Sequence, residues 1–181
     1  MYFKFNVNLT DKDYLDYNTF WMIKSPYGKK QMLKIRILIT ICIAIFALVF
    51  FLGEKNTVNA WIGIIPYFLL LGLFQLLLNP TMGWILKENI KSLKKQGKMG
   101  YSPNSEMEFF DDGFTETTPQ NKTEQKYASI ERISVVKGKI IYIHVNNVMS
   151  YLLPVSCFDS KEQYDAFLNL IKTKCSIVDI Y

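Results

Sequence analysis

Two long apolar runs dominate the hydrophobic pattern of the chain, at residues 37–53 and 61–78, and the short polar segment 54–59 joins them. Neither run contains a charged residue, and Gln75 is their only strongly polar side chain. As helices they would be roughly 25 Å long, which is close to the hydrocarbon thickness of a bilayer. The pattern therefore predicts a transmembrane helical hairpin over residues 35–78.

A soluble core or a signal peptide accounts for the apolar runs less well than a membrane hairpin does. A helical hairpin buried in a soluble core would need more surrounding chain than 181 residues provide. A cleavable signal peptide is disfavoured because the first run begins only after a long polar arm, and no small-residue cleavage site precedes the second run. We expect the hairpin to be retained.

Basic residues flank the hairpin on both sides, whereas the loop between the helices offers only Lys55 beside Glu54. This asymmetry predicts a two-helix protein of the cytoplasmic membrane with both termini in the cytoplasm. It also explains the net charge of +5 without a nucleic-acid partner. The residues expected to contact anionic lipid at the membrane surface are Lys29, Lys30, Lys34, Arg36, Lys87, Lys91, Lys94 and Lys95.

The N-terminal segment alternates between apolar and polar residues, which predicts a strand within residues 1–9. A single strand needs partners, so we expect it to join a sheet formed after residue 100. Residues 10–34 are predicted to form a cytosolic helix, capped by Thr10, and a basic linker. The aromatic side of this helix could pack on the sheet or lie in the membrane interface.

Helical spacing returns after the second apolar run. Residues 79–99 are predicted to form a basic amphipathic helix beside the membrane, with a kink at Asn79-Pro80. The glycines at positions 97 and 100 end this helix and mark the boundary of a cytosolic domain over residues 100–181.

The hydrophobic period changes to two in this last domain, which predicts short antiparallel strands followed by one amphipathic helix capped by Asp159 or Ser160. Turn-forming groups such as Asp111-Asp112-Gly113 and Asn146-Asn147 separate the strands. The expected fold is an α+β membrane protein, with an antiparallel meander, barrel-like and closed by the C-terminal helix, that resembles the pleckstrin-homology-like superfold. The strands are expected near 105–110, 114–118, 123–127, 133–137, 139–145 and 149–155.

The order of several residues along the last domain resembles the pattern of the YcxB-like family of bacterial membrane proteins. Two positions depart from that family's pattern, since Tyr127 stands where tryptophan is usual and Val155 where lysine is common. The resemblance implies an N-terminal strand and a two-helix membrane hairpin, so it would extend over nearly the whole chain, and it implies no particular activity. The residues that carry it are Asp112-Gly113-Phe114, then Tyr127, Ile130 and Ile133, then Leu153-Pro154 and Phe158, and Phe167 in the last helix.

Candidate chemical sites are sparse in the sequence. His144 is the only histidine, and no cysteine, carboxylate or nucleophile is spaced to make it a metal ligand or a catalytic base. We expect it to have a structural or surface role. Asp111 and Asp112 fit a turn better than a metal site. No CxxC spacing occurs among Cys42, Cys157 and Cys175, so neither a disulfide nor a metal cluster is expected. No cofactor is expected either, because the sequence contains no ligand-binding constellation.

The sequence thus favours a non-enzymatic interaction module, anchored in the bilayer and binding a protein partner in the cytosol. The alternative is a small immunity or stress-protection protein whose hairpin acts in the bilayer against a membrane-active toxin or peptide. Two helices cannot enclose a pore by themselves, although a homo-oligomer could.

Overall fold

The computed structural model describes residues 2–146 and 149–181 of the chain. Its contacts divide the chain into two compact units, one formed by Met1–Tyr17 with Leu93–Tyr181 and the other by Asn18–Ser92. The turn expected at Asn146-Asn147 extends beyond the described residues.

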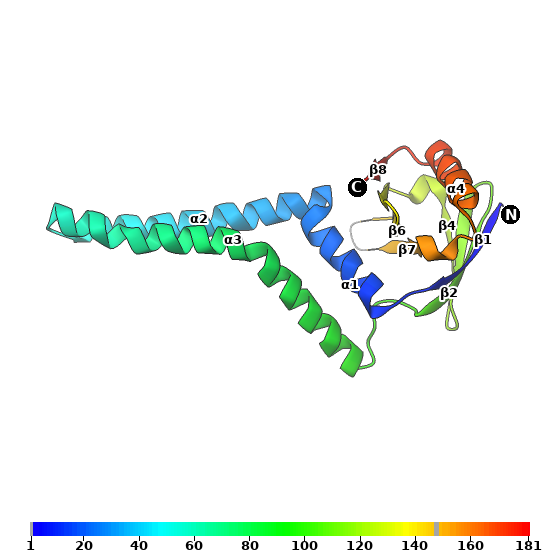
Figure 1. Ribbon diagram of the computed structural model, residues 1–181, viewed down its shortest axis with the longest axis horizontal. Coiled ribbons are helices and arrows are strands. Elements are labelled where there is room, and N and C mark those ends of the chain that lie inside the picture. Colours follow the sequence, from blue (N-terminus) through cyan, green and yellow to red (C-terminus); the bar gives the residue numbers. More distant parts are fainter. Residues whose placement is uncertain (1, 147–148) are drawn as a thin grey trace. The chain divides into compact units, whose positions relative to one another are not determined.

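The described strands of the first unit form two four-stranded sheets (Figure 1). Their strand orders are β1-β2-β3-β4 and β7-β6-β5-β8. The bounds are β1 (Phe3–Asn8), β2 (Asn104–Phe109), β3 (Gly113–Thr117), β4 (Lys122–Lys126), β5 (Arg132–Val136), β6 (Ile140–His144), β7 (Ser150–Pro154) and β8 (Val178–Ile180). Short 3₁₀ helices, η2 (Tyr127–Ser129) and η3 (Val155–Cys157), follow β4 and β7.

Strand β1 pairs with β2 over its full length. The pairing is antiparallel and runs from Phe3 opposite Phe109 to Asn8 opposite Asn104. The apolar face of β1 is buried, while on its polar face Lys4 forms ion pairs with glutamates of β2. The N-terminal strand therefore completes a sheet whose other strands begin about a hundred residues later in the chain, after the hairpin.

The expectation of one barrel-like antiparallel sheet is wrong. The described strands form two separate sheets and do not close into a barrel. Strand β8, which the sequence pattern did not predict, pairs in parallel with β5. Because β8 has only three residues and none of them is buried, it lacks the alternation that identified the longer strands.

The hydrophobic core of this unit combines both sheets with α4 (Lys161–Lys174). Ser160 caps α4 by accepting a hydrogen bond from the Gln163 amide at 3.2 Å, and the Gln163 side chain accepts one from the Asp159 amide at 2.7 Å. Phe167 of α4 is fully buried against aromatic rings of β1 and β2. The helix thus covers the apolar face that β1 completes.

Helix α1 (Asp11–Thr19) begins at the predicted cap, where the Thr10 hydroxyl accepts a hydrogen bond from the Asp13 amide at 3.2 Å. Tyr17 of α1 packs on Tyr142 of β6, with ring centroids 5.3 Å apart. The aromatic side of this helix was expected either on the sheet or in the membrane interface, and Tyr17 packs on the sheet. The chain then continues as one turn of π-helix, η1 (Phe20–Lys24).

The second unit is built from α2 (Pro26–Gly53) and most of α3 (Thr57–Lys95). Both helices are longer than expected. Helix α2 includes residues 26–34, the end of the segment predicted as a cytosolic helix and basic linker, and α3 includes residues 79–95 of the segment predicted as a separate basic helix. Pro80 lies inside α3. Figure 1 shows this helix with a bend along its length. A proline removes one helical hydrogen bond, which allows the kink without ending the helix.

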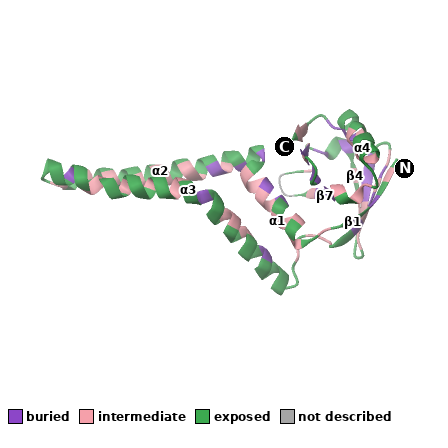
Figure 2. Cartoon of the chain, viewed as in Figure 1, coloured by how far each residue is buried: buried purple, intermediate pink, exposed green. Residues whose placement is uncertain are grey.

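Both helices are long and apolar enough to span a membrane. Their most apolar windows are 0% and 6% buried, and Figure 2 shows exposed residues along most of their length. A helix in a soluble core would hide such residues, so these two helices do not form the core of the folded chain.

Candidate functional site

A cluster of polar side chains joins α2 to α3. Arg36 donates hydrogen bonds to the side-chain oxygen of Gln75, to the Gln75 carbonyl at 3.0 Å and to Asn79 Oδ1 at 3.2 Å. Gln75 Nε2 donates in turn to Thr40 Oγ1 at 3.2 Å, and the Thr40 hydroxyl donates to the Arg36 carbonyl at 2.7 Å. Gln75, the one strongly polar side chain of the apolar runs, is therefore bonded through both its oxygen and its nitrogen.

This cluster lies where α2 changes from basic to apolar, since Arg36 directly precedes the first apolar run. A half-buried guanidinium is stabilised by carbonyl and amide oxygens that replace the hydrogen bonds of water. Interhelical hydrogen bonds of this kind contribute about 0.6 to 2 kcal/mol in membrane helices. The cluster fixes the pairing of the two helices near their open end.

The structure distributes the predicted basic residues unevenly. Arg36 is half-buried and joins the two helices. Lys91 forms an ion pair with Glu88 at 2.7 Å, and Lys94 forms one with Asp11, whose pKa it lowers. The other residues predicted to contact lipid are exposed. Three of them lie on α2 (Lys29, Lys30 and Lys34) and two on α3 (Lys87 and Lys95).

His144 belongs to a buried polar chain that the sequence did not reveal. Its side chain is 7% exposed. Nδ1 lies 2.8 Å from Ser150 Oγ, and Nε2 lies 3.1 Å from Ser134 Oγ. The Tyr17 hydroxyl donates to Ser150 Oγ at 2.9 Å. A neutral imidazole has one donor and one acceptor nitrogen, which suits two hydroxyl partners.

Burial lowers the pKa of His144 from 6.5 to about 4, and the nearby charge of Arg132 acts in the same direction while Asp179 opposes it. The ring is therefore neutral at physiological pH. Of the two roles considered for His144, the geometry places it in a structural one, because both ring nitrogens are used to join three strands of a sheet to α1.

Asp111 and Asp112 lie between β2 and β3, in the turn predicted from the sequence. The Tyr2 hydroxyl donates to the carboxylate of Asp111, and Lys174 Nζ donates to its carbonyl at 2.9 Å. These contacts attach the turn to the start of the chain and to the end of α4.

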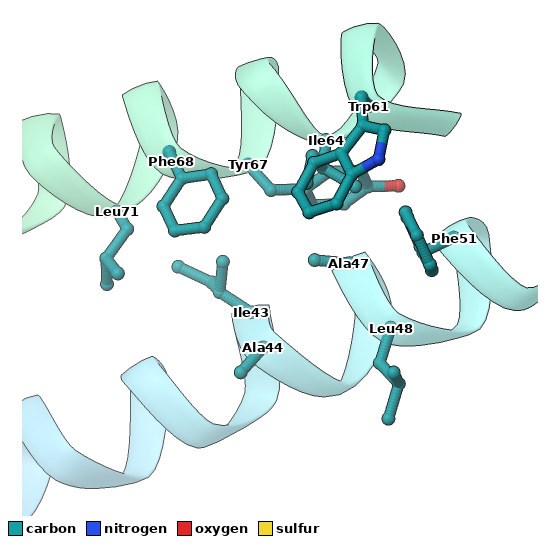
Figure 3. A pocket seen from close by; sticks show the side chains of 10 residues that line it. All are labelled: Ile43, Ala44, Ala47, Leu48, Phe51, Trp61, Ile64, Tyr67, Phe68 and Leu71. Carbon is teal, nitrogen blue, oxygen red and sulfur yellow. The ribbon is translucent and has the colours of Figure 1, made fainter. Parts of the chain in front are cut away.

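An apolar hollow of about 290 Å³ lies between the two long helices near the loop that joins them (Figure 3). The small side chain of Ala47 on α2 faces larger ones of α3 across it, and Ala44 also lines the hollow. Trp61 marks its end at the loop, where its ring lies 5.2 Å from that of Phe51. Among the residues that the structure describes, none that lines the hollow is charged.

Residues 109–171 match the family described as YcxB-like protein. The chain carries a YcxB-like family domain. The matched region begins at Phe109, the last residue of β2, and ends at Ile171 in α4. It therefore includes neither β1 nor the hairpin, and it is narrower than the near-complete resemblance expected from the sequence. Searches of curated proteins and of solved structures gave no match.

The residues that suggested the YcxB-like domain are mainly core residues. Phe114, Ile133, Leu153 and Phe167 are each completely buried. A Cβ atom on Gly113 would lie 2.1 Å from the Gln125 carbonyl oxygen, so this position requires glycine for the close approach of β3 and β4. The YcxB-like motif thus specifies packing rather than a reactive site.

Proposed function

We propose that the chain is a membrane-anchored cytosolic interaction module that binds a protein partner and has no enzymatic activity. The observation that carries this proposal is the pairing of β1 with β2. These strands are adjacent in the sheet, yet the whole hairpin separates them in sequence. The first unit, which contains both sheets and is called the sheet unit below, is therefore attached to the anchor through two chain segments rather than one.

The described chemistry supports binding rather than catalysis. His144, the sole imidazole, is neutral and held between two serine hydroxyls. The two sheets and α4 are consistent with a pleckstrin-homology-like scaffold, in which a rigid core supports variable contact surfaces.

The best surface for a protein partner is the edge formed by β8. Ile180 of β8 and the neighbouring residues Ile177 and Tyr181 are apolar or aromatic, and they are 50%, 41% and 37% exposed. β8 is the last strand in its sheet, and an edge strand can accept another chain by backbone pairing. The exposed apolar residues add contact area beside that edge.

The orientation of the anchor can be tested with reporters fused at both ends of the chain and within the loop that follows Gly53. Because basic residues flank the hairpin and Lys55 is the only basic residue of the loop, both ends should report from the cytoplasm and the loop from the opposite side. A reporter at either end that is active only outside would contradict the proposed topology.

The interaction module can be tested by exchanging the hairpin for an unrelated two-helix anchor and crosslinking partners in intact membranes. The same partners should be recovered with either anchor. Ile180→Asp should abolish their recovery, because a charge would replace an exposed apolar contact at the β8 edge. Met149→Asp is the matched control, since Met149 is 37% exposed but lies outside β8.

The alternative function, immunity or stress protection against a membrane-active toxin or peptide, is favoured by the apolar hollow between the helices. In that case the exchanged hairpin would fold and insert normally but lose protection. Recovery of protection with the unrelated anchor would refute this alternative.

A further inference from the structure

A second groove lies at the open end of the hairpin and has a different chemical character from the apolar hollow. Its volume is about 250 Å³. Within the part of the chain that the structure describes, no acidic residue contributes to its lining, which consists of Ile23, Lys29, Met32, Leu33, Arg36 and Asn79.

The groove depends on a sharp connection between η1 and α2. The Ser25 hydroxyl oxygen accepts a hydrogen bond from the Gly28 amide at 2.9 Å and caps α2. A Cβ atom on Gly28 would lie 2.1 Å from the Trp21 carbonyl oxygen, so glycine is needed for η1 to lie against the first turn of α2. This contact brings Ile23 of η1 to the groove.

The two cations of the groove share one face of α2. Lys29 and Arg36 are seven residues apart, which separates them by two turns, or about 10 Å along the helix axis. Met32 and Leu33 occupy the turn between them and provide an apolar surface. Both cationic side chains are long enough to reach toward a ligand placed between the two turns.

Arg36 retains capacity to bind an anion. Its three hydrogen bonds to Gln75 and Asn79 use the two terminal nitrogens. A guanidinium has five N–H groups, so donors remain for a further acceptor. The existing bonds also hold the side chain in place, which reduces the entropy lost when a ligand binds.

We propose that this groove binds the phosphate of an anionic phospholipid headgroup through Lys29 and Arg36. This inference rests on the proposed membrane anchoring of the hairpin, because Arg36 directly precedes the apolar run and would then lie at headgroup depth. Asn79 supplies a polar contact to the headgroup. The acyl chains would continue along the apolar run that begins at Ile37, directly after Arg36, and a soluble phosphate compound would leave that apolar surface unused.

The test compares the full chain with single variants in nanodiscs of phosphatidylcholine with or without phosphatidylglycerol. Bound lipid is measured by native mass spectrometry after release into detergent. Lys29→Gln should lower the retention of phosphatidylglycerol about tenfold, because one phosphate contact is lost. Lys30→Gln is the matched control, since it removes the same charge from an exposed neighbour that does not line the groove.

Equal losses in the two variants would overturn the proposal, because they would indicate diffuse attraction to the membrane surface. Arg36→Gln is a second variant, but it also removes the bonds between α2 and α3, so its helix content must be checked by circular dichroism. Competition by soluble glycerol phosphate as effective as that by the lipid would assign the groove to a free phosphate compound and refute the lipid as ligand. Failure of the chain to insert into nanodiscs would refute the anchoring itself, and it is scored separately by co-purification with the disc.

Discussion

Replacing Phe5 with alanine is expected to lower the free energy of unfolding of the sheet unit by about 3 to 5 kcal/mol, the usual cost of removing a buried phenylalanine side chain. Phe5 is 1% exposed, and its ring lies 4.7 to 5.8 Å from the rings of Phe109, Phe158 and Phe167. These neighbours come from β2, the segment after η3, and α4. The truncation would therefore leave a cavity where three parts of the core meet.

The measurement is hydrogen exchange of the β2 and β3 amides in the full chain, in detergent micelles. These amides should exchange much faster in Phe5→Ala, because β1 covers one edge of β2. Asn6→Ala is the matched control on the same strand, since Asn6 is exposed and its replacement should change stability by less than about 0.5 kcal/mol. Unchanged protection of β2 in the Phe5 variant would mean that β1 does not stabilise the sheet.

The stability of the same unit should fall as the solution is acidified through the range in which His144 binds a proton. The pKa of the folded-state imidazole is lowered to about 4, whereas that of the unfolded chain keeps its ordinary value of 6.5. Below the ordinary value the unfolded chain binds a proton that the folded chain does not, so acid favours unfolding. At about pH 5, this residue alone should make unfolding about 2 kcal/mol easier than at about pH 7.

The check is hydrogen exchange of the β5 and β6 amides at both pH values, corrected for the intrinsic dependence of exchange on pH. In His144→Gln the part of the pH dependence due to this residue should vanish, because glutamine does not titrate. The variant is expected to be less stable at neutral pH, since it disturbs the hydrogen bonds to Ser134 and Ser150. An identical pH dependence in the variant and the parent chain would show that His144 is not the titrating group.

Local pattern was sufficient to locate most elements of the fold. The six strands expected after residue 100 appear within about one residue of their predicted bounds, because alternation and turn-forming residues act over a few neighbouring positions. The same holds for the cap of α4 at Ser160. The ends of the long helices were harder to locate, since Pro80 and the segment before Ile37 carried signals that usually end a helix but are tolerated here.

Local sequence pattern could not predict the sites that are formed by residues far apart in the chain. Tyr17 and Ser150 are 133 positions apart, and their hydrogen bond exists only because α1 packs on the sheet that contains β7. Arg36 and Gln75 are 39 positions apart, and only the pairing of α2 with α3 shows that the glutamine accepts hydrogen bonds from the arginine. The groove at the open end of the hairpin requires the same pairing together with the turn at Gly28.

The sequence by itself determined that the chain has two helices fit to span a membrane, that a strand precedes them, and that short strands and a YcxB-like pattern follow. These features depend on composition and on spacing within a few residues. Only the tertiary structure decided that the strands form two sheets, that β8 runs parallel to β5, and that His144 and Arg36 have their particular partners. Those outcomes depend on which distant surfaces pack together, and a pattern read along the chain contains little information about that choice.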